Sequence, residues 1–234
     1  MTALSFLQQI RQSLLDLLFP PRCVGCGRVG VWLCDSCCAG LKPVLPPVCP
    51  LCGRPAAQPR LCSRCRQTPL QIDGIRSVLY FDGALRAAIH ALKYRRVQDL
   101  AGLLGGIMGD YWRDHPIPAD VIAPVPLHPA RERARGYNQA ALLARGLAEA
   151  AELPVRDDLL ARVRATAPQV KLGAEARREN VRGAFHCATG ATVGLRILLV
   201  DDVCTTGATL EACSQALRAG GATAVWALTL ARAI

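Results

Sequence analysis

Residues 196–209 read Arg-Ile-Leu-Leu-Val-Asp-Asp-Val-Cys-Thr-Thr-Gly-Ala-Thr. The uninterrupted aliphatic run at 197–200 is typical of a strand that is buried on both faces of a parallel sheet. Two aspartates, Asp201 and Asp202, follow it, and a short loop rich in threonine and glycine then leads into a helix. Ligands of open α/β sheets bind beyond the carboxyl ends of the strands. The stretch therefore predicts a parallel α/β sheet with a ligand site at this edge.

The loop after the aspartates has the chemistry of a phosphate cradle. Gly207 permits a tight turn with inward N–H groups, and a helix that begins near Thr209 presents the positive end of its dipole. Asp201 and Asp202 can accept hydrogen bonds from a vicinal diol or hold Mg²⁺ through water. A receiver domain does not fit, because too few residues follow for its phosphoacceptor, and the P-loop motif is absent. The hydroxyl donors of the cradle are those of Thr205, Thr206 and Thr209.

The rest of this half alternates apolar runs with amphipathic stretches, as βαβ units around a parallel sheet do. The expected architecture is an α/β parallel sheet flanked by helices. The predicted strands are 75–81, 121–125, 197–201 and 223–230, and the predicted helices are 84–94, 100–112, 138–152, 174–181 and 209–218.

Nine of the twelve cysteines lie between positions 23 and 65, and eight of them form four C-x-x-C pairs. Each pair turns the backbone so that two thiolates face one point, and two pairs complete a tetrahedral zinc site. A disulfide framework needs an oxidising compartment, for which no secretory leader is seen. A segment this short, with few large apolar residues, needs metal to fold, so the zinc is structural. The predicted ligands are Cys23, Cys26, Cys34, Cys37, Cys49, Cys52, Cys62 and Cys65.

Sequential pairing, with the first four of these cysteines in one site and the last four in the other, closes the shortest loops. A cross-braced arrangement is the alternative. Cys38 is spare, because its use in place of Cys37 would break the spacing that the other pairs keep. The chain thus divides into an amphipathic N-terminal helix (1–20), a cysteine-rich zinc module (21–69) and an α/β domain (70–234), all three predicted from sequence.

Composition excludes several classes of protein. The 234 residues carry a formal charge of +10, and the mean hydropathy is +0.22. No apolar run approaches the length of about 20 residues that a membrane span requires. The N-terminal stretch is interrupted by polar residues and lacks the cleavage site of a secretory leader. We therefore expect a soluble, cytoplasmic protein whose basic charge permits an anionic partner.

Several further motifs occur in one order along the chain: Leu18-Phe-Pro-Pro21, Leu92-Lys-Tyr94, Pro124-Val-Pro-Leu-His128, Arg135-Gly-Tyr-Asn-Gln139, a Thr166/Gln169 pair and residues 177–185. With them the chain resembles the ComF family of competence-associated proteins, which includes the GntX-like proteins. That family combines a double zinc ribbon with a type I phosphoribosyltransferase domain. Residues 199–209 resemble the signature with which such domains bind phosphoribosyl pyrophosphate (PRPP). Cys204 departs mildly from the signature, which usually has an aliphatic residue or threonine there.

The resemblance implies a role for each motif. Asp201 and Asp202 would bind the ribose hydroxyls at the catalytic centre, and the pyrophosphate loop, by its place in the sheet, would contain Pro126 and Leu127. Lys93 would reach the same pyrophosphate, unless it is a solvated lysine at a helix end. The 5′-phosphate would be bound by Thr205, Thr206, Gly207, Ala208 and Thr209.

The arginines at 131–135 are predicted to lie in a mobile loop over the pyrophosphate, where Arg131 and Arg135 would bind it bidentately. An exposed charged face is the alternative for this stretch. The resemblance also implies Mg²⁺ bound with PRPP. No residue pattern marks a pocket for the acceptor of the phosphoribosyl group.

Two functions follow. The first is a phosphoribosyltransferase that binds PRPP or ribose 5-phosphate with Mg²⁺, has an unknown acceptor, and is associated with DNA uptake and other DNA-uptake proteins. The alternative is a non-catalytic protein that handles single-stranded DNA through its zinc module and basic surface. The best placed aromatic side chains for stacking on bases are Trp32, Tyr94 and Tyr137.

Overall fold

The computed structural model describes residues 20–165 and 173–233. A four-stranded sheet in the order β1-β6-β5-β2 forms its centre, and all neighbouring strands are parallel. Strand β5 (Arg196–Cys204) lies between β6 (Ala224–Arg232) and β2 (Val121–Pro124), and β1 (Gly74–Tyr80) is the edge strand beyond β6. The prediction of a parallel α/β sheet is confirmed.

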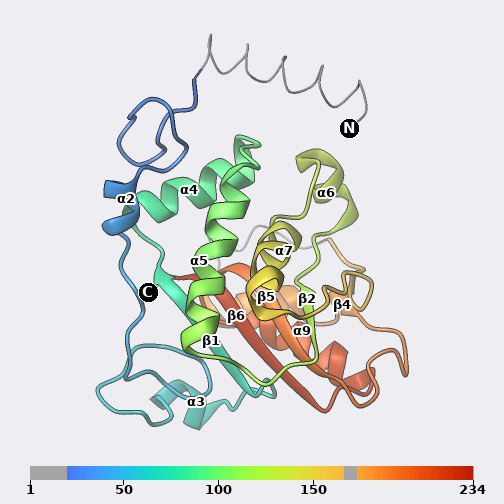
Figure 1. Ribbon diagram of the computed structural model, residues 1–234. Coiled ribbons are helices and arrows are strands. Elements are labelled where there is room, and N and C mark those ends of the chain that lie inside the picture. The colour runs from blue at the N-terminus through green and yellow to red at the C-terminus, as the bar shows by residue number, and fades with distance from the viewer. Residues whose placement is uncertain (1–19, 166–172, 234) are drawn as a thin grey trace.

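Helices cover both faces of the sheet. In Figure 1, α5 (Leu100–Asp114) and α7 (Gln139–Ala151) lie in front of the strands and α9 (Ala208–Ala219) lies behind them. The front core also contains the apolar side of α4 (Gly83–Tyr94), whereas the rear core contains α9 and the strand side chains that face it. The remaining elements of this half are α6 (Pro129–Arg135), β3 (Ala161–Arg162), α8 (Ala174–Val181) and β4 (Phe185–His186).

The cysteine-rich module lies along the β1 edge of the sheet as two lobes, which contain α2 (Asp35–Ala39) and α3 (Ser63–Gln67) (Figure 1). The segment between the lobes pairs with β1 in the antiparallel sense. Val44 N donates to Val78 O at 2.9 Å, and Tyr80 N donates to Lys42 O at 2.8 Å. The module therefore satisfies part of the backbone of an edge strand that would otherwise be exposed.

Three details differ from the sequence-based expectations. Strand β5 runs to Cys204 instead of ending at position 201, because it stays paired with β6 as far as Arg232. The expected loop at 131–135 is helix α6, which has Pro129 in its first turn and the left-handed Gly136 at its end. Those are standard signals of a helix start and a helix end, and they were present in the sequence. The short antiparallel pair β3–β4 was not predicted.

Two expectations fall outside the described residues: the N-terminal helix, apart from Pro20, and the Thr166/Gln169 pair. Among the residues that the structure describes, no helix is long and apolar enough to cross a membrane.

Helices α5 and α7 meet at two glycines. A Cβ atom on Gly105 would lie 2.8 Å from the Cα of Gly146, whereas a Cβ on the neighbouring Gly106 would meet nothing within 4 Å. The absence of side chains at these two positions lets the two helices approach each other closely.

We expect Gly105→Ala to lower the free energy of unfolding by about 1–3 kcal/mol, because the added methyl group forces the two helices apart. The matched change Gly106→Ala, on the exposed side of the same helix, should instead raise it by about 0.5–1 kcal/mol through helix propensity. Urea unfolding of both variants measures the difference. Equal effects of the two changes would show that the helices do not meet at Gly105.

Candidate functional site

The two aspartates lie side by side at the carboxyl end of β5, as predicted. Asp202 is only 3% exposed, and its Oδ2 pairs with Lys93 Nζ at 2.6 Å. Asp201 is half-buried, and its Oδ1 accepts a hydrogen bond from Asp202 N at 2.8 Å. Lys93 comes from the last turn of α4, where it is largely buried and is not a solvated helix-end lysine. The ion pair thus ties α4 to the central strand.

The buried charges shift one another's protonation. Burial, with the nearby charge of Asp202, raises the pKa of Asp201 to about 7. Burial lowers the pKa of Lys93, but the charge and hydrogen bond of Asp202 outweigh it, so the pKa is raised overall. Lys93 is therefore cationic at neutral pH, and Asp201 is poised to exchange a proton.

A cavity of about 190 Å³ opens beside the aspartates. It brings together residues from α4, β5, α6 and the segment after β2, which lie far apart in the sequence. Eight of the predicted site residues line it: Lys93, Pro126, Leu127, Arg131, Arg135, Asp201, Asp202 and Thr209.

The three arginines of helix α6 differ in their surroundings. Arg131 and Arg135 line the cavity, whereas Arg133 is exposed and does not. The Arg135 guanidinium donates a hydrogen bond to Gln139 Oε1 and lies 5.8 Å from the centre of the Tyr94 ring. The alternative of a purely exposed charged face therefore holds for Arg133 alone.

The predicted phosphate loop is only partly at the cavity. Thr209, in the first turn of α9, lines it, but Thr205, Thr206, Gly207 and Ala208 do not. Gly207 has a left-handed backbone (φ 80°), as the tight turn requires. The Thr206 hydroxyl accepts a hydrogen bond from Ala208 N at 3.4 Å, so in this structure it serves the turn.

Three polar side chains that line the cavity were not predicted to belong to this site: Tyr94, Gln139 and Arg162. Arg162 is the most informative, because it is 8% exposed and its guanidinium lies 5.3 Å from the Phe185 ring. It stands on the two-residue strand β3, which is too short to leave a periodic pattern. Tyr94 was expected only as a platform for stacking on bases, and Gln139 belongs to a motif to which no role was assigned.

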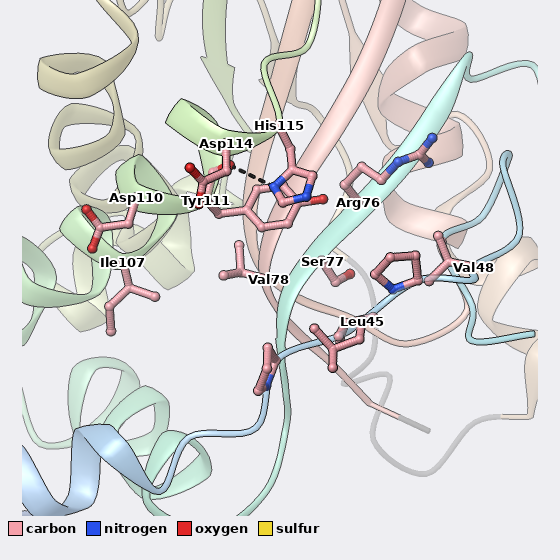
Figure 2. A pocket seen from close by; sticks show the side chains of 14 residues that line it. Leu45, Val48, Arg76, Ser77, Val78, Ile107, Asp110, Tyr111, Asp114 and His115 are labelled. Atoms are coloured by element: carbon pink, nitrogen blue, oxygen red, sulfur yellow. Dashed lines mark hydrogen bonds between the residues drawn. The ribbon is translucent and has the colours of Figure 1, made fainter.

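A second cavity, of about 410 Å³, lies elsewhere, between the segment 43–48, β1 and the end of α5 (Figure 2). Its walls are mainly apolar. Tyr111 stacks on His115 with ring centroids 4.5 Å apart, and the dashed line in Figure 2 joins His115 Nδ1 to Tyr111 O at 3.3 Å. Its acidic side chains are Asp110 and Asp114, which suit an anionic ligand poorly.

The cysteines gather into two clusters with sequential pairing. One contains Cys23, Cys26, Cys34 and Cys37, the other contains Cys49, Cys52, Cys62 and Cys65, and in each the Sγ atoms lie within 4.8 Å of one another. The cross-braced alternative is therefore not the arrangement seen, and Cys38 lies outside both clusters.

The spacing of the thiols fits a metal site. The Sγ atoms of Cys26 and Cys34 are 3.6 Å apart, and those of Cys52 and Cys62 are 3.7 Å apart. Tetrahedral Zn–S bonds of about 2.3 Å place sulfur atoms about 3.8 Å apart. Burial opposes ionisation of Cys23 and Cys49, but nearby backbone N–H groups outweigh it and lower the pKa of each thiol to about 6. In the same clusters, the hydrogen bond with Cys23 raises the pKa of Cys37 and burial raises the pKa of Cys65, so without metal only part of each cluster favours the thiolate form.

Fold and site together define a parallel α/β domain with a cationic cavity at the carboxyl edge of its sheet, preceded by a two-cluster zinc ribbon. The double zinc ribbon domain matches residues 14–66. DNA utilization protein YhgH of Salmonella typhi is 35% identical over 209 residues, 86% of this chain and 91% of that protein. Competence protein F of Haemophilus influenzae is 32% identical over 224 residues, 91% of this chain and 97% of that protein. The chain belongs to the ComF family, and the resemblance stated above is confirmed.

Three further comparisons are more distant. Competence protein ComFC of Bacillus subtilis is 28% identical over 208 residues, which are 86% of this chain and 84% of that protein. Among solved structures, the allosteric regulatory enzyme of purine biosynthesis and glutamine PRPP amidotransferase from B. subtilis each have a TM-score of 0.40, at 23% and 25% identity. They match 56% and 57% of this chain, which spans 26% of the length of each of those chains.

We expect purified protein to contain about two zinc ions per chain, one for each cluster. Cys37→Ser should lose one of them, whereas the adjacent Cys38→Ser should keep both, because only Cys37 belongs to a cluster. Metal analysis of the two variants measures this, and chelation should unfold the module. Cysteines found as C-x-x-C disulfides without zinc would contradict the assignment.

Proposed function

We propose that the cavity binds PRPP or ribose 5-phosphate together with Mg²⁺, and that the protein transfers the phosphoribosyl group to an acceptor in the context of DNA uptake. The charge balance of the cavity carries this proposal. Four cationic side chains face two carboxylates, an excess of two positive charges that suits a ligand with several phosphate groups. The cations are those of Lys93, Arg131, Arg135 and Arg162.

The transfer requires one bond to break and one to form. Pyrophosphate leaves the anomeric carbon with the electron pair of the C–O bond, and the acceptor forms its bond to that carbon. We assign Asp201 and Asp202 to the ribose hydroxyls, and Arg131 and Arg135 to the departing pyrophosphate, which guanidinium groups bind bidentately. Such a site works mainly by positioning and electrostatics. Its acceptor is the part of the reaction that no described residue identifies.

The donor set fits a magnesium ion only in combination with a ligand. Mg²⁺ prefers oxygen and keeps several waters. The cavity offers the carboxylates of Asp201 and Asp202, but one Asp202 oxygen is engaged by Lys93 at 2.6 Å. The carboxylates would therefore hold the ion largely through water, while the ligand's own oxygens bind it directly. When bound, Mg²⁺ supplies charge neutralisation at the pyrophosphate.

Asp201 and Asp202 should bind the 2′ and 3′ hydroxyls of the ribose. Wild-type protein is expected to bind ribose 5-phosphate more tightly than 2-deoxyribose 5-phosphate, since a hydrogen bond to a charged group contributes about 1.5–3 kcal/mol. The double variant Asp201→Asn, Asp202→Asn should lose most of this preference. Calorimetry gives the dissociation constants for the two sugar phosphates and hence their ratio. Both sugars carry the same phosphate, so the effect of the altered cavity charge on phosphate binding cancels in this ratio. An unchanged ratio would contradict the assignment.

Helix α6 offers a matched control for the pyrophosphate. Arg131→Ala should reduce the affinity for PRPP more than that for ribose 5-phosphate, because only PRPP carries the pyrophosphate. Arg133→Ala removes the same charge from the exposed side of the same helix and should leave the PRPP preference unchanged. Equal effects of the two changes would point to a general charge effect.

Single-stranded DNA is the second candidate ligand, favoured by the names of the relatives and by exposed basic and aromatic side chains. Tyr94 is 68% exposed beside Arg135. Tyr137 is not a stacking platform, because it is 8% exposed and its hydroxyl donates to Leu92 O. Trp32 is half-buried, and its indole N–H donates to Asp99 at 3.0 Å.

If DNA binds through the zinc module, Arg60→Ala with Arg66→Ala should lower both the affinity for an oligonucleotide and its salt dependence. The log-log slope against salt should shrink by about 0.7 for each phosphate that the variant no longer neutralises. Arg64 is left unchanged, because it borders Thr206 and Ala208 in space although it is distant in sequence. Fluorescence anisotropy across a salt series measures the slope. Loss of binding in Arg131→Ala alone would place the DNA at the cavity instead.

A further inference from the structure

The second cysteine cluster packs directly on the sheet. Ile75 N donates to Leu51 O at 2.8 Å, and the Arg76 guanidinium donates to Pro50 O at 2.9 Å. Gly53 is so close to β1 that a Cβ there would lie 2.3 Å from Ile75 O, and its backbone is left-handed (φ 66°). The knuckle at 49–52 is therefore seated on the edge strand by main-chain contacts.

Arg232 connects this knuckle to the loop that follows β5. It is 3% exposed at the end of β6, and its guanidinium donates to Cys52 O at 2.8 Å and to Cys204 Sγ at 3.0 Å. Cys204 is the last residue of β5, directly before Thr205. One buried guanidinium thus joins a cysteine of the second cluster to the start of the predicted phosphate loop.

Two other contacts place the same lobe against the loop. A Cβ on Gly207 would lie 3.0 Å from the Cδ1 atom of Ile75, the residue that the knuckle holds. Arg64 of α3 and Thr206 of the loop line a common cavity of about 160 Å³. The second lobe therefore borders the loop through β1, β6 and α3.

The first cluster supports a different part of the molecule. A Cβ on Gly25 would lie 2.9 Å from the Cβ of Ala84, at the start of α4. Its side chains belong to the front core, whereas Cys204 and Ala208 belong to the rear core. A substitution in the first cluster is therefore a suitable control for a substitution in the second.

We infer that Arg232 is a positioning residue that holds the loop 204–209 against the second cluster, so that zinc in this cluster fixes the conformation of the loop. Removing the guanidinium leaves the Cys52 carbonyl and the Cys204 thiol without this shared donor in a buried place. Removing zinc frees the Cys52 backbone, and Arg232 then has one fixed acceptor fewer. The effect on the loop follows from these contacts alone. The effect on ligand binding rests on the proposed function.

The test uses full-length protein without ligand. Arg232→Met keeps the length of the side chain and removes its donors, so the amides of 203–210 should exchange hydrogen about tenfold faster. Arg232→Lys keeps one donor and should restore part of the protection. Thr229→Val, on the same strand as Arg232, is the matched control, because it removes a buried 2.7 Å hydrogen bond to Ser77 of β1, and Thr229 lies opposite Asp201, before the loop. Equal acceleration of the loop in Thr229→Val and Arg232→Met would overturn the inference.

Zinc is tested separately by Cys62→Ser in the second cluster and Cys26→Ser in the first. Each should lose one zinc ion by metal analysis, and only Cys62→Ser should accelerate exchange at 203–210. This comparison decides the matter even if Arg232→Met does not fold. Unchanged loop protection in Cys62→Ser, with its zinc lost, would overturn the inference.

Ribose 5-phosphate then separates this inference from the proposed function. Where the wild type binds it, Arg232→Met should bind about tenfold more weakly, because fewer molecules hold the loop in the binding conformation. Wild-type protein that does not bind the sugar phosphate contradicts the proposed function alone, while the exchange results still support or refute the role of Arg232.

Discussion

Strand β5 is paired along both edges and covered on both faces, so each polar group on it needs a partner. Residues 197–200 of the strand are aliphatic and have no polar side chain that needs a partner. At its carboxyl end the chain instead places Asp202, whose charge is balanced by Lys93 from α4, and Cys204, whose sulfur accepts a hydrogen bond from Arg232. An isolated carboxylate there would cost several kcal/mol. The position of α4 and the contact with the zinc module both follow from the need to compensate this end of one strand.

The zinc module depends on the sheet as much as the sheet depends on it. Residues 21–69 have little apolar core besides their cysteines, and each lobe packs against the α/β domain. The first lobe adds Leu33 and two cysteines to the core in front of the sheet. The second lobe, together with the segment between the lobes, satisfies backbone groups of β1 that would otherwise form an open sheet edge. We therefore expect zinc and the sheet to stabilise this segment together.

Local patterns in the sequence were sufficient for much of this structure, and their failures have identifiable causes. Aliphatic runs and C-x-x-C spacing predicted the strands and both clusters, because burial and metal geometry act over a few residues. Helix α6 was missed although Pro129 and Gly136 marked its ends, since its arginines suggested a loop. Arg162 and Arg232 could not be found in this way. Each is a buried arginine whose partners, Phe185 and Cys52 among them, are set only by the tertiary fold.

The charges that line the cavity distinguish the two proposed ligands, a sugar phosphate and DNA. Both ligands are polyanions, so the cationic side chains of the cavity attract either one. The two carboxylates do not, because they suit a vicinal diol, and deoxyribose within a DNA strand has no 2′ hydroxyl and carries its 3′ oxygen in a phosphodiester. A DNA strand drawn over the cavity would bring phosphates toward Asp201 and Asp202 without a hydroxyl pair to compensate them. Under the proposed function, the cavity of about 190 Å³ with this acidic pair would therefore take one phosphoribosyl unit, and we expect DNA on the exposed basic surface of the zinc module instead.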